Sequence, residues 1–312
     1  MKKNVLVTGG AGYIGSTLVP ALLEEGYAVT VLDNFMYRQN SLAAVCHRKD
    51  FSVHNGDVRD ENVLKPLLKN ADAVIPLAAL VGAPLCDRDR TAAKTVNHDS
   101  IVRLLKLMSP DQQVLFPVTN SGYGVGRPGR ECNEKSPLRP VSLYGKLKVG
   151  IERRILERKN SLTFRLATVF GMSPRMRIDL LVNDFTYRAL KDRFIVLFES
   201  HFKRNYIHVR DVARVFLHGL GRFEKMKGQP YNVGLSDANL SKWELCERIQ
   251  KQLPDFYFTE APVGRDPDKR DYIVSNAKIE RTGFRPKYSL NDGIRELIQG
   301  YRMIQNSRYS NV

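Results

Sequence analysis

The stretch Thr8-Gly9-Gly10-Ala11-Gly12-Tyr13-Ile14-Gly15 joins a strand pattern to a helical pattern. It follows the apolar run Val5-Leu6-Val7 and precedes Ser16-Thr17-Leu18-Val19, where the helical spacing begins. Glycines at positions 9, 12 and 15 let the backbone turn sharply and approach a bound group closely, while the first amides of the helix face negative charge. The stretch therefore predicts a diphosphate-binding turn between a parallel strand and a helix.

The next strand pattern indicates which dinucleotide this turn would hold. The run Ala28-Val29-Thr30-Val31-Leu32 ends at Asp33 and Asn34. A carboxylate at this place accepts hydrogen bonds from both hydroxyls of an adenosine ribose and repels a 2′-phosphate. The pattern predicts NAD rather than NADP, although Arg38 lies close by in sequence and would suit the extra phosphate.

The first half of the chain alternates short β-rich runs with helical patterns, which is typical of an α/β fold with a doubly wound, Rossmann-type parallel sheet. Two of the runs, 73–77 and 113–119, are continuously apolar, as expected for strands buried on both faces. The predicted strands span 4–8, 28–33, 51–55, 73–77, 113–119 and 163–167, and a long helix is predicted over 142–158.

After residue 170 the alternation breaks, and we expect a smaller, interwoven C-terminal domain that binds the substrate. The NAD-binding domain is predicted to span 1–170, and the substrate domain 171–204 and 234–312. Residues 205–233 are predicted to return to the first domain, with a strand at 206–209, a helix at 211–223 and a strand at 231–233. The binding cleft is expected at the carboxyl ends of the parallel strands.

Composition indicates a folded chain in a reducing compartment. Of its 312 residues, 43% are hydrophobic, which is enough for a large core. The four cysteines are widely spaced without a Cys-x-x-Cys pair, which predicts reduced thiols and no metal site. No apolar run reaches the roughly 20 residues that cross a bilayer, and the first residues do not resemble a signal peptide. We expect a cytoplasmic protein with no membrane partner.

The net charge of +16 is compatible with a polyanionic partner. The basic residues, however, are spread over both halves of the chain without a basic arm or run. We therefore expect no nucleic-acid partner. Part of the excess would suit a smaller anion, a nucleotide diphosphate.

Tyr144 and Lys148 stand four residues apart in the predicted helix 142–158, so they share one helix face. A free tyrosine has a pKa of about 10, and a nearby cation lowers this pKa by favouring the phenolate. The spacing predicts that Tyr144 acts as a base, with Lys148 as the cation that lowers its pKa.

With this pair, the chain resembles the extended short-chain dehydrogenase/reductase family of nucleotide-sugar epimerases and dehydratases. The resemblance covers essentially the whole chain. It is carried by the glycine-rich turn at 8–15, Asp33-Asn34, Gly56-Asp57-Val58-Arg59-Asp60, Leu77-Ala78-Ala79, Thr119-Asn120-Ser121-Gly122-Tyr123-Gly124 and Tyr144-Gly145-Lys146-Leu147-Lys148.

This resemblance implies an NAD-dependent enzyme acting on a nucleotide-diphosphate sugar, with a catalytic triad of Thr119, Tyr144 and Lys148. The implied cofactor-binding residues are Gly9, Gly12, Tyr13, Ile14, Gly15, Asp33, Asn34, Asp57, Val58, Leu77, Ala78, Ala79, Tyr144 and Lys148. The implied substrate-binding residues are Val81, Asn120, Ser121, Asn183, Arg204, Arg265 and Arg270. The arginines would contact the substrate diphosphate, because their planar donors suit phosphate oxygens.

Residues that differ from the family's motifs after Thr119 reduce the number of reactions that the chain could catalyse. In the sugar 4,6-dehydratases of this family the catalytic Thr is followed by Asp and Glu, which eliminate water. Here Asn120 and Ser121 stand in these places, and an amide and a hydroxyl are no acid/base pair at neutral pH. No cysteine lies between 119 and 131, which disfavours epimerisation at carbons 3 and 5. Chemistry at C4 of the sugar remains.

Two segments, 76–86 and 170–179, resemble a bacterial subgroup that oxidises C4 of GDP-linked glycero-manno-heptose for capsule polysaccharide synthesis. This resemblance implies a GDP-linked substrate more than a UDP-linked one. A 4-epimerase acting on a hexose is the alternative reading. A non-catalytic NAD(P)-sensing or RNA-binding protein stays open as a third, and the retained triad argues against it.

The family resemblance also implies a homodimer built on helices near 99–108 and 142–158. Apolar residues at helical spacing, Ile101, Leu104, Leu105, Met108, Ile151 and Ile155, could form such an interface. Packing into the core of a single chain explains the same spacing equally well.

Overall fold

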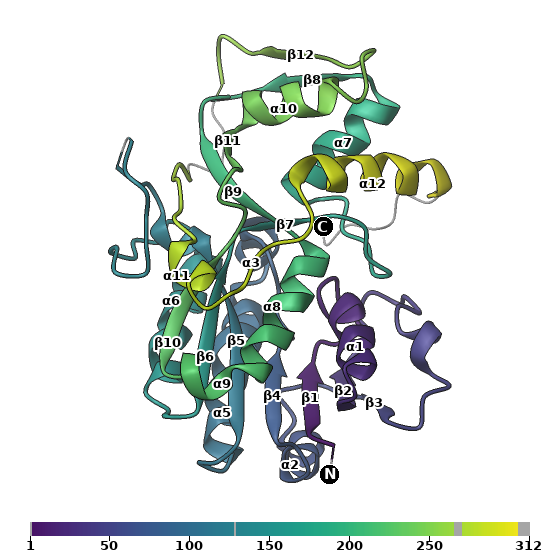
Figure 1. Ribbon diagram of the computed structural model, residues 1–312, viewed down its shortest axis with the longest axis vertical. Helices are drawn as coiled ribbons and strands as arrows, with labels where there is room; N and C mark the ends of the chain where they lie inside the picture. The colour runs from purple at the N-terminus through teal and green to yellow at the C-terminus, as the bar shows by residue number, and fades with distance from the viewer. Residues whose placement is uncertain (1, 128, 265–269, 305–312) are drawn as a thin grey trace.

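A computed structural model describes residues 2–127, 129–264 and 270–304 (Figure 1). Its centre is a seven-stranded sheet with the strand order β10-β6-β5-β4-β1-β2-β3, in which all neighbours pair in parallel. The predicted Rossmann-type sheet is confirmed. The strands are β1 (Asn4–Thr8), β2 (Ala28–Asp33), β3 (Phe51–Asn55), β4 (Ala73–Pro76), β5 (Gln113–Thr119), β6 (Ser161–Leu166) and β10 (Gln229–Val233).

Helices cover both faces of this sheet, which explains why its strands read as continuous apolar runs. On one face α1 (Gly15–Glu24) packs against α8 (Val209–Gly221), and their apolar residues share one core with the sheet. The other face is covered by α2 (Glu61–Lys69), α5 (Ser100–Leu107) and α6 (Leu143–Leu156), around a second core.

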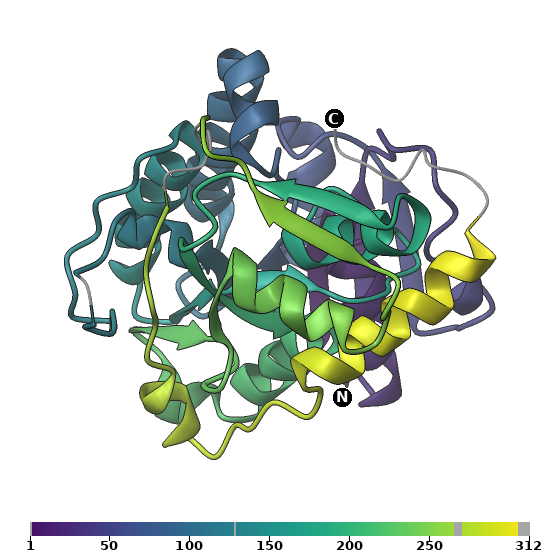
Figure 2. The same cartoon turned by 90° about the horizontal axis from the view of Figure 1, so that it is seen from above.

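A smaller group of elements, here called the C-terminal lobe, stands at the carboxyl ends of these strands (Figures 1 and 2). It holds a three-stranded sheet of β7 (Thr168–Phe170), β9 (Lys203–His208) and β11 (Asn239–Ser241), and a parallel pair of β8 (Phe194–Leu197) and β12 (Tyr257–Glu260). Three helices pack around one apolar core there: α7 (Leu181–Lys191), α10 (Lys242–Gln250) and α12 (Leu290–Met303).

One sequence-based expectation is wrong in this region. The strand predicted at 206–209 was assigned to the first domain, but β9 pairs with β7 and β11 and not with the large sheet. The chain returns to the large sheet only with α8 and β10. Side-chain alternation cannot show this, because it gives a strand but not its neighbours.

Short elements connect these layers. They are η1 (Ala43–Val45), α3 (Ala83–Arg88), α4 (Arg90–Lys94), the π-helical turn η2 (Thr95–Asp99), η3 (Asn120–Tyr123), α9 (Phe223–Met226) and α11 (Ala277–Glu280). Across the ranges that the structure describes, no helix combines the length and apolar character needed to cross a membrane.

The apolar residues expected at a dimer interface lie inside the chain. Ile101, Leu104, Met108, Ile151 and Ile155 are all buried in the core between α5, α6 and the sheet. Burial in this core explains their helical spacing, and the sixth residue, Leu105, is partly buried against the same core. The homodimer stays a prediction from the family resemblance.

Candidate active site

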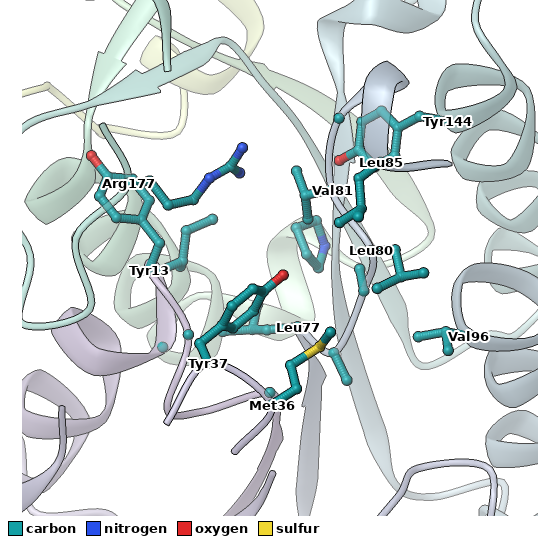
Figure 3. Close-up of a pocket in the computed structure, with 18 of the residues that line it drawn as sticks. Tyr13, Met36, Tyr37, Leu77, Leu80, Val81, Leu85, Val96, Tyr144 and Arg177 are labelled. Carbon is teal, nitrogen blue, oxygen red and sulfur yellow. The ribbon is translucent and has the colours of Figure 1, made fainter. Parts of the chain in front are cut away.

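A cavity of about 550 Å³ lies between the large sheet and the C-terminal lobe, beyond the carboxyl ends of β1, β2, β4 and β5 (Figure 3). This is where the strand order reverses between β1 and β4, the place at which ligands bind in open parallel sheets. Eighteen residues expected at the site line it: Gly9, Gly12, Tyr13, Ile14, Gly15, Asp33, Asn34, Asp57, Val58, Leu77, Ala78, Ala79, Val81, Thr119, Ser121, Tyr144, Lys148 and Arg270.

The turn after β1 has no space for a side chain at two of its glycines. A Cβ on Gly9, where φ is +70°, would lie 2.5 Å from the backbone nitrogen of Ala78. A Cβ on Gly15 would lie 2.4 Å from the carbonyl oxygen of Gly10. Gly12 is less confined, since a Cβ there would meet Gly9 O at 3.1 Å, and Gly12 lines the cavity. This cradle at the start of α1 fits the diphosphate of NAD.

Asp33 closes the turn from the end of β2. Its Oδ2 accepts a hydrogen bond from Ala11 N at 2.9 Å, and its Oδ1 accepts one from Phe35 N at 2.8 Å. Burial raises the pKa of Asp33, and these two bonds oppose that rise. Each carboxylate oxygen keeps a further lone pair for a ribose hydroxyl.

Among the residues expected to bind the cofactor, and by the family resemblance its adenine, Asp57 forms an ion pair with Arg59 at 2.6 Å, and this pairing lowers the pKa of Asp57. Val58 is buried beside it, and all three residues line the cavity. An adenine in this place would therefore meet a fixed carboxylate and an apolar side chain.

Tyr144 and Lys148 lie one turn apart on α6, and both line the cavity. Burial raises the pKa of Tyr144 to about 12 and lowers that of Lys148 to about 8. The expectation that Lys148 lowers the pKa of Tyr144 is not met in this structure, because Lys148 Nζ donates to Pro117 O at 3.2 Å. The cations that lower the pKa of Tyr144 are Arg177 and Arg270.

Thr119 ends β5, and its side chain caps the turn η3. Its hydroxyl donates to Ser121 Oγ at 2.9 Å and accepts from Ser121 N at 3.1 Å. Ser121 Oγ also accepts a hydrogen bond from the guanidinium of Arg270. Two hydroxyls and one cation thus line the same cavity as Tyr144.

Other residues expected to bind substrate lie elsewhere. Asn183 is fully buried: its Nδ2 donates to Tyr13 Oη and Arg177 O, and its Oδ1 accepts from Gly171 N. Both amide donors are used inside the fold, so Asn183 holds the chain rather than a nucleotide. Asn120 and Arg204 are buried outside the cavity lining. Arg265 lies outside the described residues.

Asn120 has a further property that the sequence does not reveal. Both polar atoms of its side chain are buried and have no hydrogen-bond partner among the described residues. The position that holds the acid of a dehydratase is therefore turned into the protein. Asn120 is not among the residues that line the cavity.

Two arginines without a sequence-based role also line the cavity, Arg175 and Arg177. Both are buried in the loop of residues 171–180, between β7 and α7. The guanidinium of Arg175 lies 3.7 Å from the centre of the Tyr37 ring. The hydroxyl of Tyr37 is buried, has no hydrogen-bond partner in the part of the chain described, and belongs to a residue of the cavity wall. Two arginines separated by one residue, in the segment after residue 170 where the regular alternation breaks, were the available signal.

The cavity has the features of a site for a dinucleotide and a second, anionic ligand. Comparison with known proteins agrees: residues 5–234 match the model of the NAD dependent epimerase/dehydratase family. The chain belongs to this family. It is an NAD-dependent enzyme of the nucleotide-sugar epimerase/dehydratase type.

Individual relatives agree over nearly the whole length. UDP-glucose 4-epimerase 2 of Arabidopsis thaliana is 29% identical over 95% of this chain and 94% of its own length. dTDP-glucose 4,6-dehydratase of Streptomyces niveus is 27% identical over 96% of this chain and 93% of its own length. The structure of UDP-glucose 4-epimerase from Thermus thermophilus in complex with NAD matches with a TM-score of 0.81 at 25% identity, covering 96% of this chain and 99% of that one.

Proposed function

We propose that this enzyme oxidises C4 of a nucleotide-diphosphate sugar and reduces it again, as a 4-epimerase. The observation that carries the proposal is that Thr119 and Tyr144 lie in one cavity, while the residues after Thr119 are Asn120 and Ser121. A hydroxyl and a buried amide supply no acid and base for removing water. Relatives named as UDP-glucose 4-epimerases support the same choice.

Each residue then has a defined task. Tyr144 takes the proton of the C4 hydroxyl, and the hydroxyl of Thr119 bonds to the same oxygen. Lys148, which is fixed on Pro117 O, would hold the ribose of the nicotinamide half of the cofactor. NAD, when bound, supplies the acceptor for the hydrogen that leaves C4. Arg270, which lines the cavity, would contact the substrate diphosphate.

A second candidate is a GDP-glycero-manno-heptose 4-dehydrogenase, which would release the keto sugar. Its specific support is the segment 170–179, which resembles this subgroup and contributes Arg175 and Arg177 to the cavity. Two arginine side chains would suit a sugar with a longer, oxygen-rich tail.

The experiment is a mass-spectrometric assay of purified protein with UDP-glucose, dTDP-glucose and GDP-linked heptose, in deuterated water with added NAD. A 4-epimerase gives a product of unchanged mass without deuterium at C4. A dehydrogenase gives a product lighter by H₂ and accumulates NADH. A product lighter by one water contradicts both candidates.

A further inference from the structure

Tyr37 and Arg175 form a stacked pair between two loops that are far apart in the sequence. Tyr37 belongs to the loop after β2, and Arg175 belongs to the loop of residues 171–180 between β7 and α7. The guanidinium of Arg175 lies 3.7 Å from the centre of the Tyr37 ring, and both residues line the cavity. Figure 3 shows the Tyr37 ring standing in the cavity on the side of Tyr13. The pair therefore connects the large sheet to the C-terminal lobe along one side of the cavity.

Arg175 is held in a fixed position by the protein around it. The residue is 1% exposed, its Nη1 donates to Met176 O at 3.2 Å, and its backbone nitrogen donates to Ser16 Oγ at 3.2 Å. Ser16 lies in the first turn of α1, directly after the glycine-rich turn. A buried, planar guanidinium in a fixed place attracts the face of an aromatic ring strongly, because water does not compete for its charge.

Tyr37 contributes its ring to this contact and not its hydroxyl. The side chain is half-buried, and its Oη has no hydrogen-bond partner in the part of the chain that the structure describes. The backbone around it is bonded locally, since Arg38 N donates to Phe35 O at 2.8 Å. The stack on Arg175 is therefore the contact that ties the Tyr37 side chain to the C-terminal lobe.

The pair lies beside the residues that would hold the cofactor. Tyr37 follows Asp33 by four positions, and the charge of Arg175 is among the influences that lower the pKa of Asp33 against the raising effect of burial. The loop that carries Arg175 is also bonded to the glycine-rich turn, where Tyr13 Oη donates to Gly171 O at 2.7 Å. The turn and Asp33 fit the diphosphate and a ribose of NAD, and one loop and one stack join both places to the C-terminal lobe.

We propose that Tyr37 and Arg175 are positioning residues for the cofactor, and that their stack slows both the entry and the release of NAD(H). The stack joins two walls of the cavity, and a ligand as long as a dinucleotide passes only when these walls separate. Because the stack consists of protein groups alone, it acts before as well as after the cofactor binds.

The consequence for catalysis rests on the proposed function. A 4-epimerase has to keep NADH between the oxidation and the reduction of one sugar, whereas a dehydrogenase that releases the keto sugar has to exchange its cofactor. A stack that slows the release of NADH therefore favours the epimerase.

The test measures the rates of NADH binding and release by stopped-flow fluorescence, with excess NAD displacing bound NADH from the full chain. Tyr37→Leu removes the ring, and Tyr37→Phe keeps the ring but removes the hydroxyl. Arg175→Lys keeps the charge but removes the planar guanidinium. The matched control is Tyr231→Leu, because Tyr231 lies in β10 outside the cavity lining and Lys278 Nζ lies 4.5 Å from the centre of its ring.

We expect Tyr37→Leu to raise both the binding rate and the release rate by about 10-fold, so that Kd changes by less than about threefold. Arg175→Lys should raise both rates as well, since an ammonium does not stack as a guanidinium does. The double variant should be no faster than Tyr37→Leu, because both substitutions remove one contact. Tyr37→Phe and Tyr231→Leu should keep the wild-type rates. If Arg175→Lys does not fold, the three tyrosine variants decide the test.

Four results would overturn the inference. The first is equal rates in Tyr37→Leu and the wild type, and the second is an equal acceleration in Tyr231→Leu. The third is a rise of the release rate alone, which would make Tyr37 a direct contact of the cofactor. The fourth is an equal acceleration in Tyr37→Phe. These measurements need no sugar, so a panel in which no nucleotide sugar is oxidised would reject the proposed function without changing the result for the stack.

Discussion

The cavity wall formed by the turn after β1 is made of backbone, whereas the wall formed by residues 171–180 is made of buried charged side chains. In the first wall, Gly9 and Gly15 pack so closely that a Cβ would touch another backbone. In the second, Arg175 stacks on Tyr37, and Arg177 pairs with Asp179. Close approaches of backbone to backbone build the first wall, and contacts between side chains build the second.

The two walls are joined by a few side-chain hydrogen bonds. Tyr13 Oη donates to Gly171 O at 2.7 Å, and Ser173 Oγ donates to Tyr13 O at 2.7 Å. Ser173 Oγ also lies 2.8 Å from Ser16 Oγ. The loop that carries both arginines is therefore attached to the start of α1. A substitution at this junction should alter the packing of both walls.

The largest expected effect is the loss of the base. Tyr144→Phe keeps the ring that packs against Leu80 and Leu85 but removes the hydroxyl. We expect oxidation at C4 to fall by about 1,000-fold or more, since general base catalysis contributes about 10²–10⁴-fold. The rate of product formation, with a nucleotide sugar that the wild type converts, measures this loss. The affinity for NAD, measured by calorimetry, serves as the control. Unchanged turnover would remove Tyr144 from the mechanism.

The backbone wall is tested by Gly9→Ala with Gly26→Ala as its control. Both glycines have positive φ, +70° and +84°, but a Cβ on Gly26 meets nothing within 4 Å. We expect Gly26→Ala to cost about 1 kcal/mol of backbone strain and Gly9→Ala about 3 kcal/mol or more, because the clash with Ala78 is added. Urea denaturation gives both values. Equal costs would mean that the close approach at Gly9 is relieved without strain.

The buried cation on α6, Lys148, should make stability depend on pH. Burial lowers the pKa of Lys148 from 10.5 to about 8, so between these values the unfolded chain binds a proton that the folded chain has released. Stability contributed by this group is complete above pH 10.5 and is lost as pH falls through about 8, by up to about 3 kcal/mol.

Lys148→Met should therefore flatten the rise of stability between these pH values, relative to the wild type. Lys146→Met, at an exposed position on the same helix, should keep the wild-type slope. Denaturant titrations at several pH values measure both slopes. An unchanged slope in Lys148→Met would show that this ammonium is better solvated than its burial indicates.

The smallest effect is expected at the junction of the walls. Tyr13→Phe removes the hydroxyl that bonds to Gly171 O and Asn183 Nδ2, whereas Tyr301→Phe removes a buried hydroxyl that bonds to Asn183 O within the C-terminal lobe. Each should cost about 1–2 kcal/mol of stability. Only Tyr13→Phe should also weaken NAD binding, as measured by cofactor titration. Equal affinities in the two variants would show that the junction does not support the cofactor wall.

Much of the first wall was predictable, because its information is local. Glycine spacing, the carboxylate of Asp33 and the apolar strands gave the parallel sheet and the cavity at its carboxyl ends. The same reasoning failed for β9, since a strand pattern does not name its partners. It also could not decide what covers the apolar stripe containing Ile151. The sequence pattern of a buried helix face is the same whether the face packs inside its own chain or against a second copy.

Local sequence thus established the cofactor turn, the parallel Rossmann-type class of the sheet, and the spacing of Tyr144 and Lys148 on one helix. Folding in three dimensions established which charge faces which group. Lys148 is near Tyr144 in sequence but is held by Pro117, while Arg177 is far away in sequence and shares the cavity with the phenol. The reason is physical: a helix fixes the separation of two side chains, but burial and hydrogen bonding to other elements fix where their charged ends lie.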